Sequence, residues 1–227
     1  MDVSIPWQSQ TLWEATHYFP FAAACYGYRL YLYQSTCLTG VLPLACTASG
    51  CVNAPVHPDR AGDAPGPGGI ALPPEERDGC CMCSFAAARL ITRAPTDAFL
   101  RVRFQNSLAE RPFLLARDSQ RRNLVLAVRG TLSLSDAVVD VDAAPMDVSD
   151  HPSVQALLER AGCLGVEQSS RLSVHRGMWR AAEHLYRYLE SNRLLQDAEN
   201  DAWGIVVLGH SLGAGVATLL TIHLQVR

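Results

Sequence analysis

The sequence lacks any apolar run long enough to cross a bilayer. A membrane-spanning helix needs roughly 18 to 20 consecutive apolar residues. The richest stretches, "YFPFAAACYGY" and "LTGVLPLACTASGC", are too short and too interrupted. The amino terminus "MDVSIPWQSQ" also lacks the basic and apolar regions of a secretory signal peptide. These absences predict a chain with no membrane span, whose first residues lie in the cytosol.

The sequence also lacks a surplus of basic charge. It has 19 basic residues against 22 acidic ones, and its formal net charge is −3. Proteins that bind nucleic acid usually present a basic patch or stripe to the phosphates. We therefore expect no nucleic-acid partner.

Cysteine is abundant, with eight residues in the chain. Without a secretory context, reduced thiols are expected. One arrangement would use four of them as zinc ligands, but their spacing matches no standard zinc motif. Small, partly buried apolar side chains are the favoured interpretation. The cysteines are Cys25, Cys37, Cys46, Cys51, Cys80, Cys81, Cys83 and Cys163, and the zinc alternative concerns Cys46, Cys51, Cys80 and Cys83.

Composition divides the chain into three parts. Residues 53–79 are mostly Pro, Gly, Ala and charged residues, which predicts a disordered insert. Residues 1–52 form a flanking segment, in which aromatic residues at helical spacing over 11–28 precede an extended "YRLYLY". Packing of that helix on the core is favoured over a membrane surface, because it has no basic face. Residues 80–227 are expected to form the main α/β domain.

Within residues 80–227 helices and strands alternate. A short helix from "SFAAARLI" leads to a strand near 99–104, and a "DSQRR" turn joins two strands. The second of these, "LVLAV", is apolar on both faces, as in a central strand. We next expect a helical turn capped by Ser133 or Ser135, and then a helix in "HPSVQALLERAG". An extended segment then leads into an amphipathic helix, which carries on one face Trp179, Ala182, Tyr186 and Leu189. This order predicts an α/β fold with a parallel or mixed sheet.

The residues "GHSLG", 209–213, match G-x-S-x-G. They follow the apolar "IVVL" and precede the helical "AGVATLL", which is the strand, turn and helix context that a nucleophile elbow requires. Gly209 and Gly213 would let strand and helix approach without colliding Cβ atoms. The pattern predicts Ser211 as a nucleophile and the Leu212 amide as a donor to an oxyanion.

A second oxyanion donor is expected after another central strand. "LVLAVRGT" ends at Thr131, whose amide and hydroxyl would point at the same oxygen. Taken alone, "RGT" is more often an ordinary turn at the end of a strand. Beside a nucleophile elbow, the oxyanion-hole interpretation is favoured.

Three segments together resemble class 3, fungal-lipase-like α/β-hydrolases, and most of all the catalytic region of sn-1-specific diacylglycerol lipases. They are "VLAVRGTLSLSDAVVDV", "VHRGMWRAA" and "VVLGHSLGAGVATLL". The upstream "ATHYFPFAAACYGYRLYLY" and "CCMCSFAAA" extend the resemblance. It implies that Ser211 is the nucleophile and that Thr131 and Leu212 form the oxyanion hole. It also implies structural roles for Asp136, Asp140 and His175.

The resemblance implies hydrolysis of diacylglycerol at the sn-1 position to 2-monoacylglycerol and a fatty acid. It further implies association with the cytosolic face of the plasma membrane and calcium-associated activity. A hydrolase of other acyl esters or thioesters is an alternative. Another is a non-catalytic chain that acts by binding a membrane or a full-length lipase.

The sequence lacks the partners that would activate Ser211. A serine hydroxyl needs a base, and in this family Asp and then His follow the serine. No Asp follows Ser211, and the only later histidine, His223, would lie roughly 18 Å away along one helix. His210 is expected to diverge from Ser211 on so tight a turn. We therefore expect an incomplete lipase chain that is inactive alone, whose "IVVL" strand is an exposed apolar edge.

Overall fold

The computed structural model describes residues 6–34, 44, 83–104, 111–130, 143–162, 171–200 and 202–225. Several predictions lie outside these residues and stay predictions. They concern the insert at 53–79, the helical turn after Thr131, the residues Thr131, Asp136 and Asp140, and the zinc alternative.

A four-stranded mixed sheet forms the centre of the fold. It contains β1 (Phe99–Arg103), β2 (Phe113–Asp118), β3 (Asn123–Val128) and β6 (Gly204–Gly209), in the order β1-β2-β3-β6. β1, β2 and β3 pair antiparallel, whereas β3 and β6 pair parallel. Two short strands, β4 (Pro145–Asp147) and β5 (Ser173–His175), form a separate antiparallel pair. The predicted α/β fold is confirmed, with a mixed sheet.

β3 is buried on both faces, as its sequence predicted. Leu124, Leu126 and Val128 pack into one apolar cluster, whereas Val125 and Ala127 pack into the other. Successive side chains of a strand point to opposite faces, so helices must cover both sides of this sheet. β6 lies at the edge of the described sheet, where Ile205 is 37% exposed.

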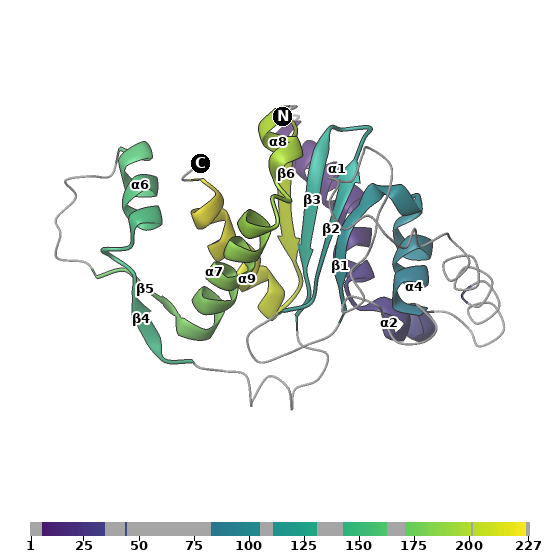
Figure 1. The fold of residues 1–227 in the computed structure, drawn as a ribbon, viewed down its shortest axis with the longest axis horizontal. Coiled ribbons are helices and arrows are strands. Elements are labelled where there is room, and N and C mark those ends of the chain that lie inside the picture. Colours follow the sequence, from purple (N-terminus) through teal and green to yellow (C-terminus); the bar gives the residue numbers. More distant parts are fainter. Residues whose placement is uncertain are drawn as a thin grey trace, which may run out of the picture.

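One face of the sheet is covered by α7 (Arg176–Ser191), α8 (Gln196–Asn200) and α9 (Leu212–Leu224) (Figure 1). The amphipathic prediction for α7 is confirmed, because Trp179, Ala182 and Leu189 are buried and Tyr186 is half-buried. The predicted helix with proline at its start is also present as α6 (Pro152–Arg160). It lies beyond α7 and α9, next to β4 and β5 (Figure 1).

The other face is covered by α1 (Pro6–Ala24), α2 (Gly27–Gln34) and α4 (Cys83–Thr92), and a short helix, η3 (Thr96–Ala98), leads into β1. The extended prediction for "YRLYLY" was wrong, because these residues form α2. Gly27 turns the chain with a φ of +63°, and a Cβ there would lie 2.5 Å from the Ser84 Cβ. This close packing of α2 on α4 outweighs the strand preference of alternating Tyr and Leu.

The C-terminal half of α1 is fixed to the sheet. His17 Nε2 lies 2.7 Å from Asp118 Oδ2. Asn123 Nδ2 donates to Tyr18 Oη at 2.7 Å. Just after the end of α1, Cys25 Sγ donates to the Ala127 carbonyl at 3.3 Å. The prediction that this aromatic helix packs on the core is confirmed.

Cys25 is 1% exposed, and its burial raises the pKa of its thiol to about 12. It stays protonated at neutral pH and acts as a small buried side chain, as predicted for the cysteines in general.

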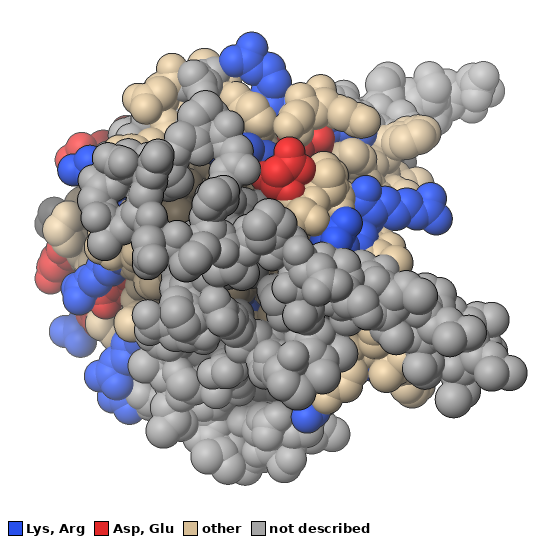
Figure 2. All heavy atoms as spheres, turned by 45° about the vertical axis from the view of Figure 1, so that its right-hand side comes forward, with Lys and Arg blue, Asp and Glu red and all other residues tan. Residues whose placement is uncertain are grey.

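The described surface mixes both signs of charge. Figure 2 shows basic and acidic side chains interspersed along one side of the molecule and separated by uncharged surface. Among the helices of the described residues, none is both long enough and apolar enough to span a membrane.

Candidate active site

Ser211 stands at a strained turn between β6 and α9. Its φ of 57° and ψ of −128° lie outside the regions that residues with a side chain normally occupy. β6 ends at Gly209, α9 begins at Leu212, and the serine is exposed. The strand, sharp turn and helix predicted from the sequence are therefore present.

Two glycines make this turn possible. A Cβ on Gly209 would collide with the Gly213 carbonyl and lie 2.7 Å from the Ala214 nitrogen. A Cβ on Gly213 would collide with the Val128 carbonyl at the end of β3. Because neither glycine has a Cβ atom, α9 can begin directly against the parallel strands β3 and β6. This confirms the role predicted for Gly209 and Gly213.

α9 begins directly after the serine, and its first amides form the turn. The Gly213 amide donates to the His210 carbonyl at 3.0 Å, and the Ala214 amide donates to the Ser211 carbonyl at 2.9 Å. Leu212 is the first helical residue, where amides have no partner within the helix. The helix dipole adds partial positive charge at this point. The role of the Leu212 amide as an oxyanion donor stays a prediction, which the start of α9 at this residue supports.

Gly130 brings the end of β3 to the same turn. A Cβ on Gly130 would collide with the His210 carbonyl and lie 3.0 Å from Ser211 Cβ. The neighbouring Thr131, predicted as an oxyanion donor, lies outside the described residues. Its role stays a prediction, and it is supported by the position of Gly130.

Tyr26 is a residue of this region that the sequence did not reveal. Its Oη lies 2.7 Å from His210 Nδ1, and 3.1 Å from the position of a Gly130 Cβ. Burial raises the pKa of Tyr26, so the phenol is protonated at neutral pH. Tyr26 follows α1 and is 184 positions from His210, so no local pattern could have paired them.

The histidines expected to be unsuitable as bases are engaged elsewhere. His210 bonds to Tyr26, and His223 is 2% exposed, with Nδ1 3.4 Å from Ser153 Oγ. His175 accepts from the Met178 amide at 3.2 Å and caps α7, which agrees with a structural role.

A close His and Asp pair does exist, but at the wrong end of the sheet. His17 and Asp118 lie beside Asn123, whereas the elbow lies beside Val128. Five residues of strand separate these ends by roughly 16 Å. The pair therefore anchors α1 and does not reach Ser211.

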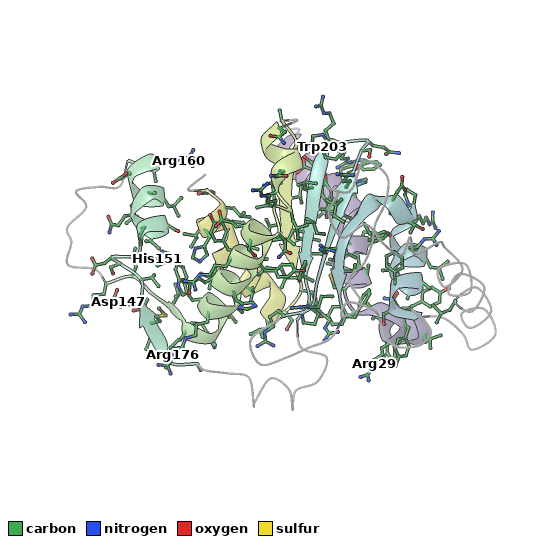
Figure 3. The ribbon with its side chains drawn as sticks, viewed as in Figure 1. Arg29, Asp147, His151, Arg160, Arg176 and Trp203 are labelled. Atoms are coloured by element: carbon green, nitrogen blue, oxygen red, sulfur yellow. The ribbon has the colours of Figure 1, made fainter. Side chains whose placement is uncertain are left out.

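An apolar pocket with a volume of about 210 Å³ adjoins the elbow. It is lined by side chains from α1, the turn after it, α2 and the elbow: Phe19, Ala22, Ala23, Tyr26, Leu30, Gln34 and His210. Figure 3 shows Trp203, just before β6, and Arg29 of α2 toward opposite ends of the molecule. β6 thus runs toward α2, and the elbow closes one side of the pocket.

The described part of the chain contains no cluster of side chains typical of a metal site. No group of three or more His, Cys, Asp or Glu side chains gathers there. The calcium implied by the family resemblance stays a prediction.

The mixed sheet covered on both faces, with an exposed serine at a strained strand-to-helix turn, defines an α/β-hydrolase fold. Residues 125–227 match the family described as lipase (class 3). This region of the chain is therefore similar to the class 3 lipases.

Diacylglycerol lipases are similar in sequence to nearly the whole chain. It is 30% identical over 214 residues to mouse (Mus musculus) diacylglycerol lipase-beta, covering 92% of this chain and 27% of that protein. It is 32% identical over 225 residues to rat (Rattus norvegicus) diacylglycerol lipase-alpha, covering 93% of this chain and 19% of that one. The chain thus spans about a quarter or less of the length of these relatives.

Among solved structures, a Rhizomucor miehei triacylglyceride lipase is similar, with a TM-score of 0.48 and 17% identity. The match covers 96% of this chain and 57% of that one.

Proposed function

We propose that this protein is a serine hydrolase of glycerolipids that acts on diacylglycerol. The observation that carries the proposal is the geometry of Ser211, which is exposed at a strained elbow directly before the first turn of α9. The names of the diacylglycerol lipase relatives support the substrate class. Cleavage at the sn-1 position, giving 2-monoacylglycerol and a fatty acid, is the finer part of the proposal and rests on the family resemblance.

In the proposed reaction, Ser211 Oγ attacks the ester carbonyl. A base takes the serine proton and passes it to the departing alcohol, which leaves an acyl group on Oγ. Water then attacks this acyl group, and the fatty acid departs as the serine regains its proton. The Leu212 amide and Thr131 donate to the carbonyl oxygen while it carries negative charge.

The proposal includes the setting in which a glycerolipase works. Its substrate dissolves in membranes, so we expect the protein to act at the cytosolic face of a membrane, the plasma membrane by resemblance. Calcium dependence, by family resemblance, is part of the same proposal, whereas association with a full-length lipase belongs to the non-catalytic alternative.

A second candidate function has its own support. His210 and His223, the histidines nearest to Ser211 in the sequence, bond to Tyr26 and Ser153 instead of to the serine. The alternative is that the 227-residue chain does not turn over ester and acts by binding. The other alternative, a hydrolase of different acyl esters, shares the elbow and differs only in substrate.

One experiment separates these candidates. The purified chain is treated with a fluorophosphonate probe and assayed with a diacylglycerol and a simple ester. Labelling and turnover that disappear in Ser211→Ala, but persist in the exposed-serine control Ser191→Ala, would support the hydrolase. Turnover of the simple ester alone would favour a different ester substrate. A chain that binds diacylglycerol vesicles without labelling or turnover would support the binding function.

A further inference from the structure

Four rings gather where α6 meets α7 and α9. The His223 ring of α9 lies 4.6 Å from the Trp179 ring and 5.5 Å from the Tyr186 ring, measured between centroids. His151, which caps the start of α6, lies 5.3 Å from His223 and 4.9 Å from Trp179. Two imidazoles from different elements therefore lie within one aromatic cluster.

This cluster attaches a separate part of the fold to the helices. Residues 145–160 and β5, which we call the arm, lie on the far side of α7 and α9 from the four-stranded sheet (Figure 1). Val148 and Val154 of the arm pack against Trp179. At the far end of α6 (Figure 3), Arg160 donates to the Gln225 carbonyl. The arm can therefore separate from the helices without breaking a strand pair of the sheet.

The surroundings of His223 favour its neutral form. The residue is 2% exposed, and its Nε2 is buried without a hydrogen-bond partner among the described residues. Its Nδ1 lies 3.4 Å from Ser153 Oγ of α6. Burial lowers the pKa of His223, and the neighbouring His151 lowers it further. A proton on this ring places a charge in a buried cluster, unless the arm moves away and admits water.

The charged groups around His223 compensate little for such a proton. Glu183 and Arg187 of α7 act on it with opposite signs, and they bond to each other at 2.6 Å. Asp147 of β4 lies 3.9 Å from Arg171, so its partner is within the same antiparallel pair of segments. α9 itself carries no other titratable side chain. Other ionisable side chains of α6 and of the central turns of α7 are exposed, namely Glu159, Arg160, Arg180 and His184.

His151 adds a second contact that a proton weakens. Its Nδ1 accepts from the Ser153 amide at 3.2 Å and so caps α6. A proton on Nδ1 removes this acceptor, and two protonated rings 5.3 Å apart repel each other. Both changes act at the surface where the arm meets α7 and α9.

We propose that His151 and His223 form an acid-sensitive switch that releases the arm. As the two rings take up protons, the arm separates from α7 and α9, while the four-stranded sheet and the elbow stay folded. Opening uncovers Leu219 and Ile222 of α9, which pack against the arm when it is closed. Ser211 lies at the other end of α9, roughly 18 Å along the helix, so the elbow keeps its geometry. The proposal does not depend on the hydrolase function.

Fluorine NMR of the 227-residue chain labelled with 5-fluorotryptophan tests the switch. Trp179 reports the arm, and Trp203, just before β6, reports the sheet. Between about pH 7.5 and 5.0, the Trp179 signal should move toward that of an exposed tryptophan, whereas the Trp203 signal should stay in place. Each proton taken up should raise the equilibrium constant for opening by up to about tenfold per pH unit below about 6.5. The signals are assigned by their loss in Trp179→Phe and Trp203→Phe.

Variants of the two histidines show which rings respond. His223→Phe keeps a ring in the cluster, and His151→Asn keeps an oxygen that can cap α6. Each should make the transition of the Trp179 signal shallower, and the double variant should remove it. The matched control is His184→Phe, on the exposed side of α7, which should respond as the unsubstituted chain does.

The comparison of the two tryptophans in the unsubstituted chain decides the proposal even where a variant fails to fold. A Trp179 signal that stays fixed over this pH range would overturn it. Movement of the Trp179 and Trp203 signals at the same pH would overturn it as well, because the whole domain would then unfold together. An unaltered transition in the double variant would show that other groups take up the protons and would also exclude the switch.

Discussion

The two faces of the sheet come from different parts of the sequence and contribute different things to the site. α7 and α9 lie within the family-matched residues 125–227, and α9 carries the amides behind Ser211. α1, α2 and α4 precede that region and supply Tyr26 and most of the pocket. The serine elbow and the apolar residues of the pocket thus meet at the end of β3 and β6, although they come from elements on opposite faces of the sheet. Substitutions can test whether this division is real.

The largest effect is expected on the reactive side. In a form of the protein that hydrolyses esters, Thr131→Ala should lower the rate by about 10² to 10³ fold, because one oxyanion donor is lost. The unfolding midpoint should change little. Rates are measured with a diacylglycerol, and Thr131→Ser, which keeps a hydroxyl, serves as the control. An unchanged rate in Thr131→Ala would remove this residue from the site.

A smaller effect tests whether α1 is part of the domain. Phe21 is 7% exposed, so Phe21→Ala should lower the free energy of unfolding by about 3 kcal/mol. Phe19 is 63% exposed on the same helix, so Phe19→Ala should change it by less than about 0.5 kcal/mol. Urea unfolding followed by circular dichroism measures both. Equal effects would mean that α1 is an appendage rather than a layer of the fold.

Tyr26→Phe tests the contact that joins the two sides. The variant keeps the ring but loses the hydrogen bond to His210, at a cost of about 1 kcal/mol in unfolding free energy. The nitrogen-15 chemical shifts of His210 should change as well, because Nδ1 loses its hydrogen-bond partner. Tyr28→Phe, on an exposed ring of α2, provides the comparison. Unchanged His210 shifts would contradict the contact.

The smallest expected effect is a pH dependence of the unfolding free energy that comes from His223 of α9. Burial and the nearby His151 and Arg187 lower the pKa of His223, whereas Glu183 raises it. The unfolded chain therefore binds the His223 proton more readily, and stability should fall as the pH drops below about 6.5. In His223→Phe, the unfolding free energy should fall less as the pH drops.

Urea midpoints between about pH 7.5 and 5.5 measure the slope. The exposed His184, on α7, gives a control in His184→Phe, which should keep the original pH dependence. A steeper acid loss in His223→Phe would reverse the assigned direction.

The elbow and its glycines could be predicted from the sequence because their constraints are local. A strand, a serine between glycines and a helix occupy adjacent residues, and the collisions at Gly209 and Gly213 follow from that order. The central position of β3 was predictable for the same reason, since a strand buried on both faces must be apolar throughout.

Contacts between distant residues were not predictable. Tyr26 meets His210 only because α1 packs along β3, and nothing near Tyr26 in the sequence indicates it. α2 was expected to be extended because its alternating residues favour a strand, and its packing on α4 outweighed that preference. The pocket was missed because it exists only where α1, α2 and the elbow meet.

The parallel pairing of β3 with β6 also has a consequence for the order of folding. Asn123 pairs with Gly204, so the chain between them must fold back before the elbow can form. Closing so long a loop costs entropy that local hairpins such as β2 and β3 do not incur. We therefore expect the geometry at Ser211 to form late in folding. A probe that recognises only the assembled serine would report complete folding, while a partly folded chain would keep an unreactive hydroxyl.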